Sequence, residues 1–430
     1  MADEIRLIDI VEEFISGDWG EESATNDAPC AVSCIRGADI VPISNSRFEN
    51  IPVRYISAAS LKNRGLSEGD IIIEKSGGSP TQSTGRTVYV SKKLVEEKKN
   101  IVCSNFCQAF RIKQGWNPLY VYYYLQVVYN SGVFFNFEGK TSGLKNLILD
   151  SAFQSIMIKK VPLQEQDRVA GLLSLIDEKI AANHAINDYL AAMARQLYDY
   201  WFVQFDFPDE NGRPYKSSGG KMVWNDKLKR EIPEGWDVVS VFDGANVLYG
   251  FPFSTESFSE QATNKPIVRI RDILDGSVSA YTTECVDEKY RLNKGDVIIG
   301  MDGNFHMNIW QDDSAFLNQR CVRIRPKLGT TVSSIQILYD AKPYIEAREK
   351  TIKGSTVGHL SDKDMKQLQI LVAQQNKSFN PRPVFDTIVD EISKNRIEIS
   401  NFMKQRDDLL PLLMNGQVSV KPLNNHLSAD

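Results

Sequence analysis

The chain carries one sequence pattern twice, about half its length apart. LSEGDIIIEKSGG occupies residues 66–78, and LNKGDVIIGMDGN occupies residues 292–304. Both copies place a Gly-Asp turn directly before a run of β-branched residues, which is typical of a strand that follows a tight turn. An internal repeat constrains the fold more than any local signal, because each copy must build the same structural unit. The repeat therefore predicts two related globular domains in one chain.

Other segments recur in the same order around this pattern. Aligning Asp39 with Asp272 also matches Arg36 with Arg269. Chance does not explain so many landmarks in one order. The corresponding segments are 32–41 and 266–276, 106–113 and 319–327, 140–147 and 353–360, and 175–180 and 388–393.

The composition is that of a globular protein, with 42% hydrophobic and 24% charged residues. No apolar run approaches the ~20 residues that span a bilayer. The acidic N-terminus does not read as a signal peptide. Six cysteines in a chain of 430 residues do not suggest a disulfide scaffold, so we expect a cytoplasmic protein.

The net charge of −5 conceals an uneven distribution. Residues 1–30 contain nine acidic residues and one basic residue, a net charge of −8. Residues 31–160 contain 17 basic and nine acidic residues, a net charge of +8. The basic character of residues 31–160 slightly favours a polyanionic ligand over a merely solvated surface.

Each half is expected to contain strands and Gly-rich polar loops, followed by a long helix. Pro162 and Pro381 stand where helices tolerate proline, at the start. Apolar residues at 4-3 spacing predict that each helix carries the narrow seam of a coiled coil. The predicted seam is Leu175, Ala182, Ile186, Tyr189, Met193 and Tyr200 in the first half, with exceptions at Lys179 and Gln196, and Ile388, Ile392, Ile399, Phe402, Leu409 and Leu413 in the second half, with interruptions at Asn395 and Arg406.

We therefore predict an α+β protein in which two globular domains form a pseudo-symmetric repeat. A long helix follows each domain, and the two helices pair as an antiparallel coiled coil, since a helix of this length is not covered by one small domain. Two domains on such a rod suit a ligand with two separated sites, and DNA is the first candidate. A two-headed protein-binding adaptor is the alternative.

The sequence resembles the specificity (S) subunit of type I restriction–modification enzymes along essentially its whole length. The resemblance rests on GDIIIEKSGGSPTQSTG, LQEQDRVAGLLSLIDEKI, LYDYWFVQFDFPDENGRPYKSSGGKMVW and REIPEGW. It implies a target recognition domain 1 at 1–161 (the first domain), a spacer helix at 162–203, a linker at 204–236, a target recognition domain 2 at 237–380 (the second domain), and a second spacer helix at 381–417 with a tail to 430.

The resemblance also implies partners and a division of labour. Each recognition domain would read one half of a split, asymmetric double-stranded DNA site, and the helices would set the unspecified gap. The chain would recruit two methylation (M) subunits and restriction (R) subunits. S-adenosylmethionine, Mg²⁺ and ATP would be bound in those partners, and no cofactor is expected in this chain.

The residues themselves also argue against a catalytic centre. NPRPVF at 380–385 separates its prolines and stands where a helix begins, unlike the loop of an amino-methyltransferase. SSGGKMVW lacks the hydroxyl residue that a phosphate-binding loop needs after Lys221. We therefore expect no catalytic residue and a stand-alone enzyme is disfavoured. The four histidines, His184, His306, His359 and His426, have no catalytic spacing.

Four cysteines form two pairs whose spacing zinc permits, Cys30 with Cys34 and Cys103 with Cys107. On strands each pair would share one face, which suits small buried residues equally well. We favour the second interpretation and predict no metal site, while zinc stays an alternative.

The candidate DNA-binding residues lie on the polar loops that correspond between the two halves. Lys, Arg, Ser, Asn, Gln and His supply the bonds that phosphates and base edges need. An apolar aromatic run at the end of the first helix is expected to pack in part, and in part to bind a methylation subunit. The predicted DNA-binding residues are Lys75, Ser76, Ser79, Gln82, Arg86, Lys140, Lys145, Asn304, His306, Asn308, Lys353, Ser355 and His359, and the predicted partner-binding residues are Tyr198, Tyr200, Trp201 and Phe202.

Overall fold

The structure is a computed structural model, and it describes residues 4–79, 82–141, 144–352, 358–373 and 379–421. The chain forms two compact units, one of residues 1–182 with 399–430 and the other of residues 183–398. Each long helix belongs in part to both units, so the predicted boundaries between domain and helix stay a prediction. Among the described helices, none is long and apolar enough to cross a bilayer.

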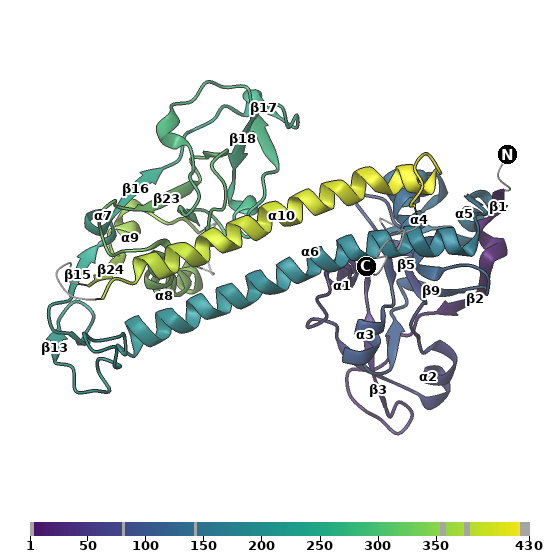
Figure 1. The fold of residues 1–430 in the computed structure, drawn as a ribbon, viewed down its shortest axis with the longest axis horizontal. Helices are drawn as coiled ribbons and strands as arrows, with labels where there is room; N and C mark the ends of the chain where they lie inside the picture. The colour runs from purple at the N-terminus through teal and green to yellow at the C-terminus, as the bar shows by residue number, and fades with distance from the viewer. Residues whose placement is uncertain (1–3, 80–81, 142–143, 353–357, 374–378, 422–430) are drawn as a thin grey trace, which may run out of the picture. The chain divides into compact units, whose positions relative to one another are not determined.

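The first domain is built on two small sheets (Figure 1). The main sheet has the order β2-β9-β5-β7 with every neighbour antiparallel, and the second has the order β4-β3-β8 with β3 and β8 parallel. A further antiparallel pair, β1 with β12, leads into the long helix α6. The bounds are β1 Glu4–Arg6, β2 Val11–Ser16, β3 Cys30–Ile35, β4 Val53–Ile56, β5 Ile71–Glu74, β7 Thr87–Tyr89, β8 Ile101–Cys103, β9 Cys107–Ile112, β12 Met157–Lys159, α1 Ile40–Ser44, α2 Ala58–Arg64, α3 Lys92–Glu97, α4 Pro118–Asn130, α5 Leu149–Ser155 and α6 Leu163–Tyr198.

The second domain repeats the framework of this topology, with an additional edge strand, β17, in its second sheet. Its main sheet has the order β16-β23-β20-β21, and its second sheet has the order β17-β19-β18-β22, in which β18 and β22 are again parallel. The pair β15 with β24 corresponds to β1 with β12. The bounds are β15 Asp237–Ser240, α7 Val241–Gly244, β16 Ala245–Tyr249, β17 Phe258–Ser259, β18 Lys265–Val268, β19 Ala280–Thr282, β20 Val297–Gly300, β21 Met307–Ile309, β22 Phe316–Leu317, β23 Cys321–Pro326, α8 Ser334–Ile352, α9 Asp362–Met365, β24 Gln369–Val372 and α10 Arg382–Met414.

The repeated Gly-Asp turn shows why the sequence pattern recurs. Gly69 has a φ of +93°, and Gly295 has a φ of +90°, a region in which other residues are strained. The aspartate that follows each glycine is 1% exposed and accepts the backbone N–H that lies three residues earlier. The two predicted domains, their shared topology and the α+β class are therefore confirmed.

The aspartate of each turn also ties two strands of the main sheet together. Arg111 on β9 donates two hydrogen bonds of 2.9 Å to Asp70. Arg325 on β23 donates bonds of 2.6 and 2.7 Å to Asp296. The same planar, two-bond pair thus joins the Gly-Asp turn to the neighbouring strand in both copies of the sheet, so Arg111 is structurally equivalent to Arg325.

The helices α6 and α10 run antiparallel within each unit. In the first unit, Ile176 and Ile180 of α6 pack against Ile399 of α10. In the second unit, Ala194 of α6 lies in one hydrophobic cluster with Ile388 of α10. Pro162 and Pro381 directly precede the two helices, as predicted. The antiparallel helix pair is thus present in each unit.

The seam predicted on α10 is confirmed, but the one predicted on α6 is wrong. On α10, Ile388, Ile399 and Leu413 are 3%, 6% and 4% exposed. On α6, Ile176 and Ile180 are buried instead of the predicted residues. The exposed fractions of the wrongly predicted residues are 58% for Leu175, 46% for Ile186, 77% for Tyr189, 42% for Met193 and 37% for Tyr200, and Ala182 is exposed as well.

Polar residues in the true seam explain the error. At 4-3 spacing, the buried face of α6 continues from Ile180 to Asn183 and Asn187. Beyond Asn187 the residues of this face are apolar again. Asn187 accepts a 2.9 Å hydrogen bond from Asn395 of α10, one of the two predicted interruptions. Arg406, the other, donates a 3.0 Å bond to Asp177. Polar seam residues of this kind specify the register of paired helices at some cost in stability.

The segment predicted as the linker is folded within the second unit. It contains the hairpin of β13 (Met222–Asn225) and β14 (Arg230–Pro233). Phe207 stacks on Trp236 with ring centroids 4.8 Å apart, and both side chains are buried. The segment therefore contributes to the hydrophobic core of the second unit.

The corrected seam predicts the effect of two matched truncations on α6. Ile180→Ala removes a side chain that is 2% exposed, so it should destabilise the first unit by about 2–4 kcal/mol. Leu175→Ala, five residues earlier and 58% exposed, should cost less than about 0.5 kcal/mol. Urea unfolding of both variants measures the difference. Equal losses in the two variants would contradict the assignment of the seam.

Candidate nucleic-acid interface

Two separately predicted loops of the first domain lie side by side. Residues Ser76–Gly77 form strand β6, which pairs with β11 (Leu144–Leu147), and β11 pairs in turn with β10 (Glu138–Thr141). The hydroxyl of Ser76 donates to the side-chain oxygen of Asn146 across this small sheet. The structure thus joins the loop that begins at Lys75 to the loop that ends at Lys145.

The predicted basic residues of this surface are partly occupied by internal ion pairs. Arg86 donates bonds of 2.8 and 2.6 Å to Glu74, whose side chain is 4% exposed. These bonds are the main cause that raises the pKa of Arg86. Lys145 lies 3.1 Å from Glu138 and above the ring of Phe135. Both cations therefore hold the loop, because the Arg86 and Lys145 side chains are only 22% and 18% exposed.

The remaining predicted residues of the first domain have different exposures. Gln82 is exposed, whereas Lys75, Ser76 and Ser79 are half-buried. Ser79 and Gln82 exchange two backbone hydrogen bonds. Lys140 belongs to β10, but its side chain lies outside the described residues.

The corresponding surface of the second domain is organised by Asp302. Its carboxylate accepts a bond of 2.5 Å from Arg320 and lies 2.6 Å from Nδ1 of His359. Burial alone would raise the pKa of Asp302, but the bonds from Arg320 and His359 outweigh it and hold that pKa below its ordinary value. An aspartate, an arginine and a histidine thus form one cluster on the surface.

The other predicted residues of the second domain differ in exposure and in internal bonding. Asn304 is exposed and His306 is half-buried. Asn308 is bound internally, because its side-chain N–H groups donate to the backbone oxygens of Ile273 and Leu274. Lys353 and Ser355 lie outside the described residues.

Sequence reasoning missed three residues on these surfaces: Phe106, Asn146 and Arg320. Phe106 is 57% exposed although it is large and apolar, and the Arg320 side chain is 63% exposed. The sequence does contain a signal for Phe106 and Arg320, because the segments 106–113 and 319–327 recur between the two halves. Phe106 and Arg320 stand in the turns just before β9 and β23.

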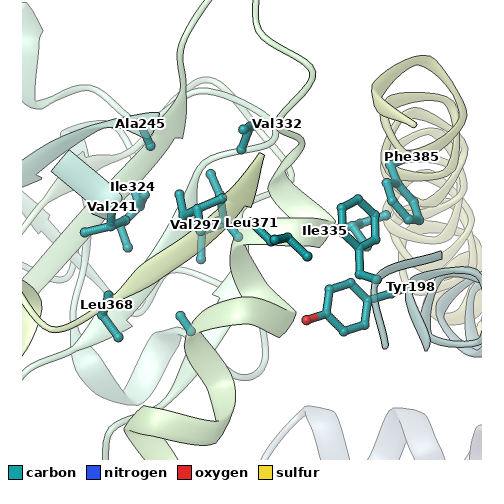
Figure 2. Close-up of a cluster of buried hydrophobic side chains, with 14 of the residues drawn as sticks. Tyr198, Val241, Ala245, Val297, Ile324, Val332, Ile335, Leu368, Leu371 and Phe385 are labelled. Atoms are coloured by element: carbon teal, nitrogen blue, oxygen red, sulfur yellow. The ribbon is translucent and has the colours of Figure 1, made fainter. Parts of the chain in front are cut away.

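The aromatic run at the end of α6 is mostly packed, which corrects the predicted partner surface. Tyr198, Trp201 and Phe202 are 7%, 9% and 1% exposed within the core of the second unit. Figure 2 shows Tyr198 among the side chains of this cluster, which also includes Phe385. Buried rings do not face a partner, so the prediction for these three residues is wrong. Tyr200, 37% exposed, is the predicted residue that stays at the surface.

The cysteines occupy buried strand positions of the first domain. Cys34, Cys103 and Cys107 are at most 1% exposed, and Cys30 is half-buried on the same strand as Cys34. Burial raises the pKa of the Cys34 and Cys107 thiols to about 12. Within the described residues, no group of three or more His, Cys, Asp or Glu side chains is arranged to hold a metal ion.

Comparison with known proteins identifies the family. The model of the type I restriction modification DNA specificity domain matches residues 40–192 and 233–377, one match in each domain. The chain belongs to this family. It is a specificity subunit of a type I restriction–modification system, and its role is DNA sequence recognition rather than catalysis. The comparisons give no support to the alternative of a protein-binding adaptor.

Individual relatives agree with this assignment. The MjaIX specificity subunit of Methanocaldococcus jannaschii is 23% identical over 94% of this chain and 93% of its own length. The EcoBI specificity subunit of Escherichia coli is 28% identical over 44% of this chain and 40% of its own length. The crystal structure of the S subunit from M. genitalium has a TM-score of 0.53 at 13% identity, with 96% of each chain covered, and so shows the same fold.

A buried carboxylate beneath the aromatic run gives the second unit a pH dependence. Burial raises the pKa of Asp340 to about 6, while Tyr198 donates a 2.7 Å bond to it. The pKa in the unfolded chain is about 4, so the folded state holds the proton between the two values. This contribution to stability is full below about pH 4 and is lost as the pH rises through about 6.

Asp340→Asn should remove this dependence, because the amide keeps the size and the acceptor for Tyr198 but does not titrate. From pH 4 to pH 7, the free energy of unfolding of the original protein should fall by about 2–3 kcal/mol more than that of the variant. Urea unfolding at pH 4, 5, 6 and 7 measures it. A difference that does not change with pH would show that Asp340 titrates normally.

Proposed function

We propose that the two recognition domains read two different DNA half-sites, so that the complete site is split and asymmetric. The observation that carries the proposal is the internal repeat: the sheet order and the Asp–Arg pair recur, whereas the exposed loop residues differ. Equal frameworks place the two loop surfaces in the same way on each domain. Different side chains on them then recognise different base pairs, because base edges are distinguished by the donors and acceptors that face them.

The residues proposed to contact DNA are those that remain available on these surfaces. Lys75, Ser76, Ser79 and Gln82 serve the first domain, and Asn304, His306 and His359 serve the second. Lys140, Lys353 and Ser355 stay in the proposal as predicted from the sequence. Arg86, Lys145 and Asn308 support the loops through their internal bonds rather than bind DNA. Positively charged members would bind phosphates, and the uncharged ones base edges.

The proposal extends to partners, following the names of the relatives as subunits of type I restriction enzymes. We propose that two methylation subunits and restriction subunits assemble with this chain. Those subunits would bind S-adenosylmethionine, Mg²⁺ and ATP. They would methylate or cleave DNA in the cytoplasm. The antiparallel helices would set the length of the unspecified gap, with the Asn187–Asn395 pair and the Asp177–Arg406 pair fixing their register.

Exchange of one domain tests the proposal. A chain whose residues 1–161 come from a relative should, with its partner subunits, methylate a site in which one half-site is new. The other half-site and the gap should stay, because the second domain and both helices are unchanged. Base-resolution mapping of methylated adenine in the host measures the site, and the reciprocal exchange of residues 237–380 is the control. A change in both half-sites after a single exchange would refute independent recognition.

A further inference from the structure

Backbone hydrogen bonds define equivalent positions on the two recognition surfaces. In each domain the backbone N–H of the residue after the repeated strand (β5 or β20) donates to the carbonyl oxygen of the residue before β9 or β23. The carbonyl oxygen of the same residue accepts from the backbone N–H of Leu147 in the first domain and of Leu360 in the second. The bonds are Lys75 N to Phe106 O and Leu147 N to Lys75 O in the first domain, and Met301 N to Arg320 O and Leu360 N to Met301 O in the second, each 2.8 or 2.9 Å long.

These bonds make three surface positions correspond between the domains. Position 76 corresponds to 302, position 106 to 320, and position 146 to 359. The backbone pairing supports this, because Ser76 is bridged to Asn146 just as Asp302 is bridged to His359. We call these residues the surface triads. The first triad is Ser76, Phe106 and Asn146, and the second is Asp302, Arg320 and His359.

The two triads have the same arrangement but different chemistry. In both, the first side chain bonds the third: Ser76 to Asn146, and Asp302 to His359. The middle residue is exposed in both, 57% for Phe106 and 63% for the Arg320 side chain. The first triad therefore presents an uncharged, partly aromatic surface, and the second presents an arginine held by an aspartate.

We propose that the surface triads are specificity-determining positions, with Arg320 reading a guanine of one half-site and Phe106 contacting a thymine methyl group of the other. This inference rests on the proposed function, since it names the residues by which each domain distinguishes bases. Arginine donates two parallel bonds to O6 and N7 of guanine, the commonest specific contact in the major groove. An exposed aromatic side chain offers apolar contact to the methyl group of thymine.

The surroundings of Arg320 favour base recognition over phosphate binding. The Asp302 side chain, only 14% exposed, lies beside the guanidinium and would repel a phosphate group. The same carboxylate orients the guanidinium before DNA arrives, so less side-chain freedom is lost on binding. Phe106, at the equivalent position, carries no charge and cannot bind a phosphate at all. Both middle residues therefore point to contact with bases.

Two substitutions of Arg320 separate the roles in the complete complex with its partner subunits. Arg320→Ala should reduce the preference for guanine at one position of one half-site by roughly 5- to 150-fold. Arg320→Lys keeps the charge but not the paired donors, so it should lose the preference as well. Competition binding with the methylated motif and its single-base variants measures the preference. Phe106→Ala should relax one thymine position in the other half-site only.

Arg213→Ala is the matched control, because Arg213 is 61% exposed and paired with Asp209 much as Arg320 is with Asp302. It should leave every base preference unchanged. The half-site read by the first domain controls for folding of each Arg320 variant. The inference is overturned if Arg320→Ala keeps the guanine preference, if Arg320→Lys restores it, or if affinity falls equally for all sequences. If the unsubstituted complex shows no preference for a split DNA site, the proposed function is overturned, and this inference with it.

Discussion

The architecture of both domains depends on one repeated ion pair, which joins the buried aspartate of the Gly-Asp turn to a partly exposed arginine on the neighbouring strand. Asp70 pairs with Arg111, and Asp296 pairs with Arg325. Losing one partner of a fully buried pair costs roughly 3–5 kcal/mol, and less here because the arginines are 37% and 30% exposed. The pair fixes β5 on β9 and β20 on β23. It thereby fixes the turns that carry Phe106 and Arg320.

The internal repeat made the fold predictable, because two copies of a sequence reveal which residues the framework requires. Arg36 and Asp39 were matched with Arg269 and Asp272 from the sequence, and in the structure each pair closes the same short helical turn. The seam of α10 was predictable because apolar residues stand at regular 4-3 spacing on both sides of Asn395 and Arg406. The seam of α6 was not, because Asn183 and Asn187 occupy it while exposed apolar residues imitate a stripe nearby.

The surfaces were harder to predict than the framework. The sequence indicated which loops correspond, and the structure joins those of the first domain in one small sheet. It did not indicate that Arg86 is bound by Glu74, because that contact links residues 12 positions apart through the fold. Nor did it separate Tyr200 from its buried neighbours, since an aromatic run at a helix end is compatible with either packing or exposure. Tertiary contacts decide both cases, and composition does not encode them.

The central claim is that this chain selects one split, asymmetric DNA site through two independent domains. The most direct measurement is a base-resolution map of methylated adenine in the host, with and without this gene, while the partner subunits are expressed and active. Deletion should remove one motif with two different half-sites and a fixed gap, and should leave other motifs unchanged. Loss of a continuous or palindromic motif, or no loss at all, would contradict the account.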